Sequence, residues 1–131
     1  MIKDIKSSKI LSIIGFCVIL LLAIVFRFAC IDKVDGLWYD ELTMYNEAVK
    51  PAFLQVLFFS LKDDVHFPLY QIFLHYWGQI FSFSDFALRC FSAVIGILTV
   101  ITGYFIGKSL NSKYLAFLLM ILFALNSYLI Y

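Results

Sequence analysis

The sequence predicts an all-helical membrane protein with three transmembrane helices and a long external loop that holds interfacial juxtamembrane helices. The first observation is composition: the chain is 63% hydrophobic and 15% charged, with a mean hydropathy of +0.95. Soluble domains are about half apolar and about a quarter charged, so this chain has too few polar groups to cover a water-facing surface. The second observation is that long apolar runs separate the charged residues. A net charge of +1 gives no basic field for nucleic acid, so we expect the lipid bilayer as partner and no nucleic acid.

The first span is predicted over residues 10–28. Lys3, Lys6 and Lys9 precede an apolar run from Ile10 to Phe26. A signal peptide would have an apolar segment of about 7–15 residues and a cleavage site with small side chains, whereas this run is longer and is followed by Arg27. We therefore expect an uncleaved helix, with residues 1–9 in the cytoplasm under the positive-inside rule.

Two further spans are predicted over residues 87–107 and 114–131. Residues 90–107 and 114–131 contain no charged side chain, and each run is long enough to approach the roughly 30 Å of a bilayer's hydrocarbon core. A basic turn over 108–113, with Lys108 and Lys113, joins them. The chain is still apolar at residue 131, so we expect it to be a fragment of a longer protein or a truncated product.

Residues 66–83 are apolar and long enough to form a fourth span, which is the alternative topology. Gln71, His75 and Gln79 recur at every fourth position and form one polar stripe, which we expect to face water or lipid headgroups. The positive-inside rule also requires an even number of crossings between Lys9 and Lys108. Both observations favour an interfacial helix over 66–83.

Residues 29–86 then form one external loop. Acidic residues outnumber basic ones eight to five between Arg27 and Arg89, which suits the outer face. Within the loop we expect helical structure over about 40–62, separated or kinked at Pro51, and the helix over 66–83.

The candidate chemistry lies at Asp40-Glu41, just beyond the first span and next to Trp38 and Tyr39. One interpretation is structural: Asp40 is the N-cap of a helix whose first turn favours acidic residues. The other is a carboxylate held at the bilayer surface as a general base.

Three basic positions also have two interpretations each. His66 stands two residues before Pro68, which suits the first turn of a helix, yet the imidazole could bind a phosphate oxygen or a sugar hydroxyl. Arg27 and Arg89 lie at the predicted outer ends of spans, where arginines anchor helices by extending to the interface. Their planar guanidinium groups also suit a lipid phosphate.

The order of these features resembles the N-terminal portion of the dolichyl-phosphate-mannose–protein mannosyltransferase-like superfamily. These are GT-C-fold glycosyltransferases, and they include the bacterial aminoarabinose transferases. The resemblance covers residues 10 onward and rests on a first span followed by these segments: Leu37-Trp38-Tyr39-Asp40-Glu41, His66-Phe67-Pro68-Leu69-Tyr70, Ser84-Asp85-Phe86-Ala87-Leu88-Arg89, and a span opening at Phe91-Ser92-Ala93.

The resemblance implies an inverting glycosyltransferase of the bacterial plasma (inner) membrane, multi-pass, with a cytoplasmic N-terminus. The donor would be a polyprenyl-phosphate-linked sugar, and the acceptor a hydroxyl of a glycan, lipid or protein. Asp40 would be the catalytic carboxylate with Glu41 beside it, while Trp38, Tyr39, His66 and Arg89 are candidate substrate-binding residues. Phe67 departs from the family pattern, in which a proline or lysine often stands before the proline. We identify no cofactor and no metal site, and a divalent-metal requirement stays open.

Family members are several times longer and have many more spans, so the 131 residues alone are expected to be inactive. The rival interpretations are a small membrane subunit that stabilises a partner, and a fragment of a transporter or flippase. A transporter would have charged or glycine-broken positions at mid-membrane, and Gly96 and Gly103 are the only such hints in the sequence.

Overall fold

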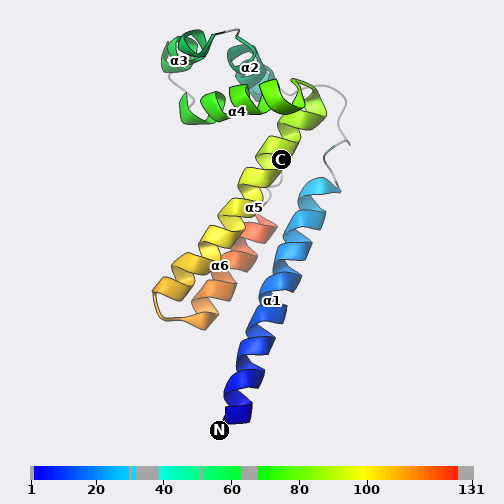
Figure 1. The fold of residues 1–131 in the computed structure, drawn as a ribbon, viewed down its shortest axis with the longest axis vertical. Helices are drawn as coiled ribbons and strands as arrows, with labels where there is room; N and C mark the ends of the chain where they lie inside the picture. The colour runs from blue at the N-terminus through cyan, green and yellow to red at the C-terminus, as the bar shows by residue number, and fades with distance from the viewer. Residues whose placement is uncertain (1, 30, 32–38, 51, 63–67, 127–131) are drawn as a thin grey trace. The chain divides into compact units, whose positions relative to one another are not determined.

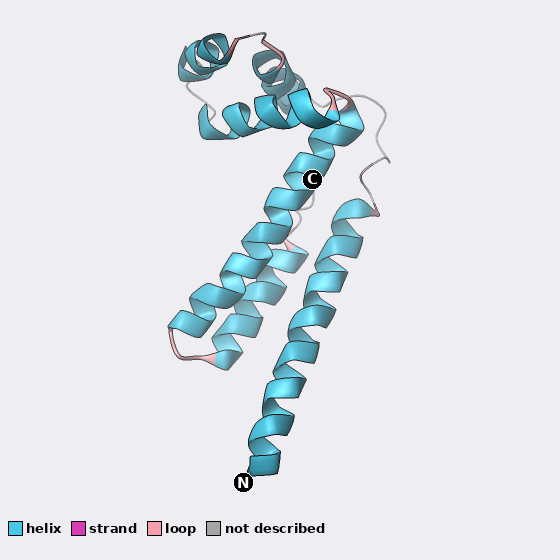
Figure 2. Cartoon of the chain, in the orientation of Figure 1, coloured by secondary structure: helices cyan, strands magenta, loops and turns pink. Residues whose placement is uncertain are grey.

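The computed structural model describes residues 2–29, 31, 39–50, 52–62 and 68–126, with the side chains of residues 2–8 and of Asp40 left outside that description. The described residues form helices joined by short turns, with no strand among them (Figures 1 and 2). In chain order the helices are α1 (Ile2–Phe28), α2 (Tyr39–Ala48), α3 (Phe53–Lys62), α4 (Pro68–Phe81), α5 (Asp85–Ser109) and α6 (Lys113–Leu125).

These helices belong to two compact units. One unit comprises residues 1–30 and 92–131, which we call the terminal unit, and the other comprises residues 31–91, the central unit. The terminal unit holds α1, most of α5 and α6. The central unit holds α2, α3, α4 and the first residues of α5.

Two helices, α1 and α5, are long and apolar enough to cross a membrane, over Lys9–Phe28 and Asp85–Ser109. With 27 and 25 residues, they are each roughly 40 Å long. The apolar side chains of α1 are mostly exposed: Leu11 is 71% and Leu21 61% accessible. A core helix of a soluble protein would bury such residues, so this surface supports a lipid environment.

The helix α6 is shorter than the sequence predicted. It begins after Ser112, whose hydroxyl accepts a hydrogen bond from the Leu115 amide at 3.2 Å, as an N-cap does. It ends at Leu125, because Asn126 has an extended backbone. Its 13 residues cover roughly 20 Å. The helix predicted over 114–131 is therefore interrupted at Asn126, and residues 127–131 lie outside the described part.

The terminal unit is held together by contacts of α6 with α1 and by a close local approach of α5 and α6. Its buried core consists of Ala23, Val100, Met120 and Ala124, with aromatic and aliphatic side chains around it. Gly107 of α5 packs directly on α6: a Cβ at this position would overlap the backbone of Ala116. Gly103, one turn earlier, lies against the ring of Phe123. The two helices approach this closely only because these positions have no side chain.

We expect Gly107→Ala to lower the free energy of unfolding by about 1–3 kcal/mol, the usual cost of overpacking. The added methyl group meets backbone, which cannot rotate out of the way. Gly15→Ala is the matched control, because its methyl group would lie 3.3 Å from the edge of the Phe117 ring, which can move. Reversible unfolding of the purified chain in mixed micelles measures both. Equal shifts in the two variants would contradict the close approach of α5 and α6.

Arg27 differs from its predicted role as an exposed anchor or a lipid-phosphate ligand. Its side chain is only 1% accessible. One terminal nitrogen donates to the Ala23 carbonyl at 3.2 Å and the other to the Phe123 carbonyl at 3.1 Å. Phe123 lies in the last turn of α6, where carbonyls lack partners within the helix and the dipole favours a cation. Arg27 therefore caps α6 and ties it to α1.

Replacing Arg27 with Met should leave the Phe123 carbonyl without this donor, which costs about 1–3 kcal/mol for a buried group. We expect faster amide hydrogen exchange across the last turn of α6 and a lower unfolding midpoint. Lys9→Met removes the same charge from an exposed position of α1 and should change exchange in that turn little. Undiminished protection in the Arg27 variant would argue against the cap.

In the central unit the predicted helical region 40–62 is two helices, with α2 ending at Ala48 and α3 beginning at Phe53. Pro51, where a separation or kink was predicted, falls between the two helices and lies outside the described residues. The helix predicted over 66–83 is α4, which begins at Pro68 and ends at Phe81. A buried cluster of Ala48, Leu74, Leu88 and Phe91 joins α2, α4 and the start of α5.

Two of the three residues in the polar stripe of α4 face inward, contrary to the prediction, whereas Gln79 is exposed. Gln71 is fully buried and His75 is 3% accessible, so neither faces water or headgroups. The apolar side chains of the same helix are exposed instead: Leu69 is 51%, Phe73 54% and Ile80 74% accessible. These two side chains face inward because α4 packs against α2 and α3. His75 contacts the Ala48 carbonyl there, whereas the amide of Gln71 has no hydrogen-bond partner among the described residues.

Candidate functional site

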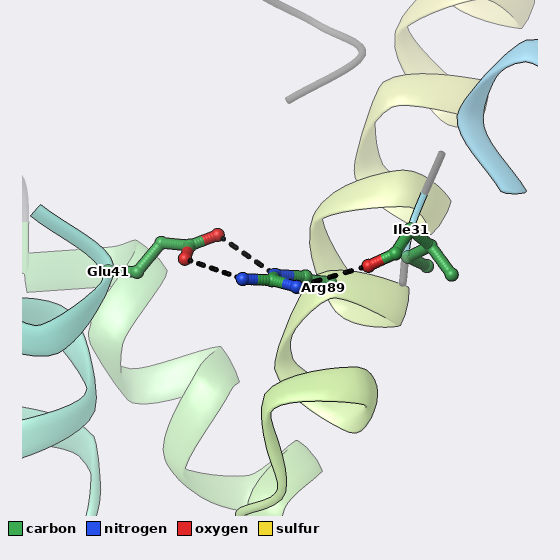
Figure 3. Close-up of polar contacts among 3 residues, drawn as sticks. All are labelled: Ile31, Glu41 and Arg89. Carbon is green, nitrogen blue, oxygen red and sulfur yellow. Dashed lines mark hydrogen bonds and ion pairs between the residues drawn. The ribbon is translucent and has the colours of Figure 1, made fainter. Parts of the chain in front are cut away.

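The candidate site centres on an ion pair between Glu41 of α2 and Arg89 of α5, both within the central unit (Figure 3). The Nε of Arg89 donates to Oε1 of Glu41, and Nη2 donates to Oε2, each at 3.4 Å. Two roughly parallel donors facing two carboxylate oxygens form the fork arrangement that suits arginine. Two of the predicted site residues, 48 positions apart in the sequence, are therefore in direct contact.

Arg89 also holds the chain just after the first span. Its third nitrogen, Nη1, donates to the Ile31 carbonyl at 3.2 Å (Figure 3). The guanidinium group thus contacts Ile31 and Glu41, which precede and follow residues 32–38. The Arg89 side chain is 13% accessible and that of Glu41 35%. The sequence interpretation placed Arg89 at the interface as an anchor or phosphate ligand, whereas its donors are directed at the protein.

The helix α2 begins at Tyr39, so Asp40 lies within its first turn rather than at the N-cap. Asp40 is thus two positions beyond the N-cap position that the structural interpretation gave it, and its side chain is outside the described part. Tyr39 is 83% accessible and available to a ligand. Trp38 and His66 lie outside the described residues.

The contact with Arg89 indicates a structural role for Glu41. Both of its oxygens are engaged by Arg89, and a carboxylate so engaged is poorly placed to take a proton from a substrate. The ion pair instead ties the first turn of α2 to α5. Glu41 is therefore better described as a residue that positions α2 than as a second base.

The other end of α2 is held by α4. The Nδ1 of His75 lies 2.7 Å from the carbonyl of Ala48, the last residue of α2, and Nε2 lies 2.8 Å from Nε2 of Gln79. A carbonyl only accepts, so the hydrogen sits on Nδ1, and the Gln79 amide then donates to the other ring nitrogen. Sequence reasoning missed this role of His75; the four-residue spacing to Gln79 was its one signal.

A third contact holds the middle of the unit. The Ser60 hydroxyl of α3 donates to Oε2 of Glu47 of α2 at 3.2 Å. Glu47 is 9% and Ser60 1% accessible. One oxygen of Glu47 thus accepts a hydrogen bond from a buried hydroxyl, and α2 is connected to α5 at its first turn and to α3 and α4 at its last turn by side-chain hydrogen bonds.

The described residues contain no group of three or more His, Cys, Asp or Glu side chains that could hold a metal ion. Comparisons of the chain with protein-family models, with curated proteins and with solved structures found no match.

The ion pair can be tested with a double-mutant cycle of Glu41→Gln, Arg89→Gln and the double variant. Because Glu41 is partly exposed, we expect a coupling energy of only about 0.5–1 kcal/mol. The measurement is reversible unfolding in mixed micelles at low salt, repeated at high salt, where the coupling should shrink. Lys62→Gln, an exposed position in the last turn of α3, should show no coupling to Arg89→Gln. Additive effects of the Glu41 and Arg89 changes would show that the two side chains do not interact and would contradict the ion pair.

Proposed function

We propose that the chain is the N-terminal part of an inverting membrane glycosyltransferase that moves a sugar from a polyprenyl phosphate to an acceptor hydroxyl at the outer membrane face. Asp40 is the catalytic base. The 131 residues form part of a longer protein and have no transferase activity by themselves. The membrane is the plasma membrane of a bacterium, with a cytoplasmic N-terminus.

The observation that carries this proposal is the ion pair between Glu41 and Arg89. The resemblance rests on an ordered set of segments, two of which end at these residues. A two-point contact between them supports a common role for the two segments. It also supports the assignment of Asp40, because it fixes the turn of α2 on which Asp40 lies.

The exposed apolar faces of α3 and α4 support a position at the membrane surface. On α3, Leu54 is 73%, Phe58 63% and Leu61 64% accessible, while Ser60 faces inward. The ring of Phe53 stacks on Tyr76 of α4, with centroids 6.4 Å apart, so the two faces adjoin. Helices that turn apolar side chains outward and polar ones inward suit the boundary between headgroups and acyl chains.

The terminal unit supports the proposed topology, in which the chain crosses the membrane twice between Lys9 and Lys108. Lys9, near the start of the apolar part of α1, lines the same cavity as Lys108 at the end of α5 and Lys113 at the start of α6. Basic residues that flank two candidate spans therefore gather at one end of the unit, as a cytoplasmic end requires.

In the proposed reaction the acceptor oxygen attacks the anomeric carbon of the donor sugar from the side opposite the phosphate. A new glycosidic C–O bond forms while the bond from the anomeric carbon to the phosphate oxygen breaks, and polyprenyl phosphate leaves with the bonding electrons. Asp40 takes the acceptor's proton. Tyr39, with Trp38 and His66, would contact the sugar and phosphate. The donors of Arg89 are directed at Glu41 and Ile31, so its role becomes the positioning of α2 rather than phosphate binding.

Asp40→Asn in the full-length protein should lower sugar transfer about 10²–10⁴-fold, the usual contribution of a general base. The assay uses polyprenyl phosphates carrying mannose or aminoarabinose, the sugars of the enzymes that the chain resembles. Asp85→Asn is the matched control, because it makes the same exchange in the first turn of α5 and should retain activity.

Membrane insertion of both variants is measured alongside transfer. Full activity of a normally inserted Asp40 variant would exclude the proposed base and favour a non-enzymatic membrane subunit.

A further inference from the structure

The described part of the terminal unit contains a cavity of about 360 Å³ between α1, α5 and α6. Each helix contributes one lysine to its lining: Lys9 from α1, Lys108 from α5 and Lys113 from α6. Its size falls within the range of small-molecule sites. It lies in a different unit from Asp40, so a ligand bound in it is independent of the proposed transferase.

The charges around this cavity are all of one sign. None of the described lining residues is acidic, so like charges of the three lysines border the same hollow. Lys113 also stands in the first turn of α6, where the helix dipole is positive and disfavours a cation. This gathering of positive charge is electrostatically unfavourable. An anion bound between the lysines would turn the repulsion into attraction.

The cavity walls indicate that the anion has an apolar part. Ile13, Ala116 and Phe117 line it beside the lysines, and the ring of Tyr104 lies 6.0 Å from the Lys108 ammonium group. A fully hydrated inorganic ion gains nothing from such walls. An amphiphile places its charged group among the ammonium groups and its carbon chain against the apolar side.

The position of the lysines favours a lipid as the source of this anion. Lys9 stands at the start of the apolar part of α1 and Lys108 in the last turn of α5, the two helices long and apolar enough to cross a membrane, and Lys113 begins α6. Headgroups of a bilayer lie at that depth, and basic pockets between membrane helices on the cytoplasmic side bind anionic headgroups. We propose that this cavity binds the headgroup phosphate of an anionic glycerophospholipid, with Lys9, Lys108 and Lys113 as its cationic ligands.

The test measures binding of phosphatidylglycerol and phosphatidylcholine to the intact chain in mixed micelles, by native mass spectrometry of the lipid-bound species. The wild-type chain should retain phosphatidylglycerol in preference to phosphatidylcholine. Lys108→Gln and Lys113→Gln should each weaken phosphatidylglycerol binding about fivefold, because a lysine near an anionic headgroup contributes about 1 kcal/mol. Lys108→Arg keeps the charge and should keep the binding.

Lys62→Gln is the matched control, because Lys62 stands in the last turn of α3 as Lys108 does in α5. It should bind phosphatidylglycerol as the wild type does. A loss equal to that of Lys108→Gln would show attraction by overall charge and overturn the site. Displacement of the lipid by millimolar inorganic phosphate would assign the cavity to a free anion and overturn the lipid assignment. If Lys108→Arg lost the preference for phosphatidylglycerol, the lysine would act through packing and not through its charge, which would overturn its role as a cationic ligand.

Discussion

Backbone carbonyls at helix ends are the groups that this chain must satisfy from within. An α-helix leaves its last carbonyls without partners, and a chain whose outer surface is apolar has little water to supply them. Arg27 donates to Phe123 in the last turn of α6, and His75 lies 2.7 Å from the carbonyl of Ala48 at the end of α2. Arg89 donates to Ile31. Long polar side chains therefore act here as caps that connect one helix to another.

A related constraint explains why α3 and α4 bury some polar side chains while many of their apolar side chains are exposed. On α4 the buried side is Gln71, Leu74, His75 and Gly78, and on α3 the buried positions include Ser60. Hydrogen bonds from Ser60 to Glu47 and from His75 to Ala48 need a sheltered setting to be worth more than contacts with water. Turning the polar side chains inward provides that shelter, and the outward apolar faces are left for lipid.

The sequence was a good guide wherever local chemistry decides the structure. Pro51 separates α2 from α3, Pro68 begins α4, and long charge-free runs become α1 and α5, because each of these depends on residues close together in the chain. It failed where a partner from elsewhere decides. A polar stripe on α4 is compatible with facing headgroups or facing α2, and only the carbonyl of Ala48 selects between them. From the sequence alone Arg27 could equally extend to the interface, and only its contact with the Phe123 carbonyl of α6 decides its direction. For the site, the sequence selected Glu41 and Arg89 without foreseeing that they bind each other.

The contact between Glu41 and Arg89 changes the roles that these two residues can have in the proposed site. Arginine presents a rigid set of donors, and here three of its nitrogens are directed at Glu41 and Ile31, so charge on a leaving phosphate must be offset by other groups. The pair with Glu41 fixes the first turn of α2, the turn on which Asp40 lies. Glu41, whose two carboxylate oxygens are both bound by Arg89, thereby holds α2 in place against α5.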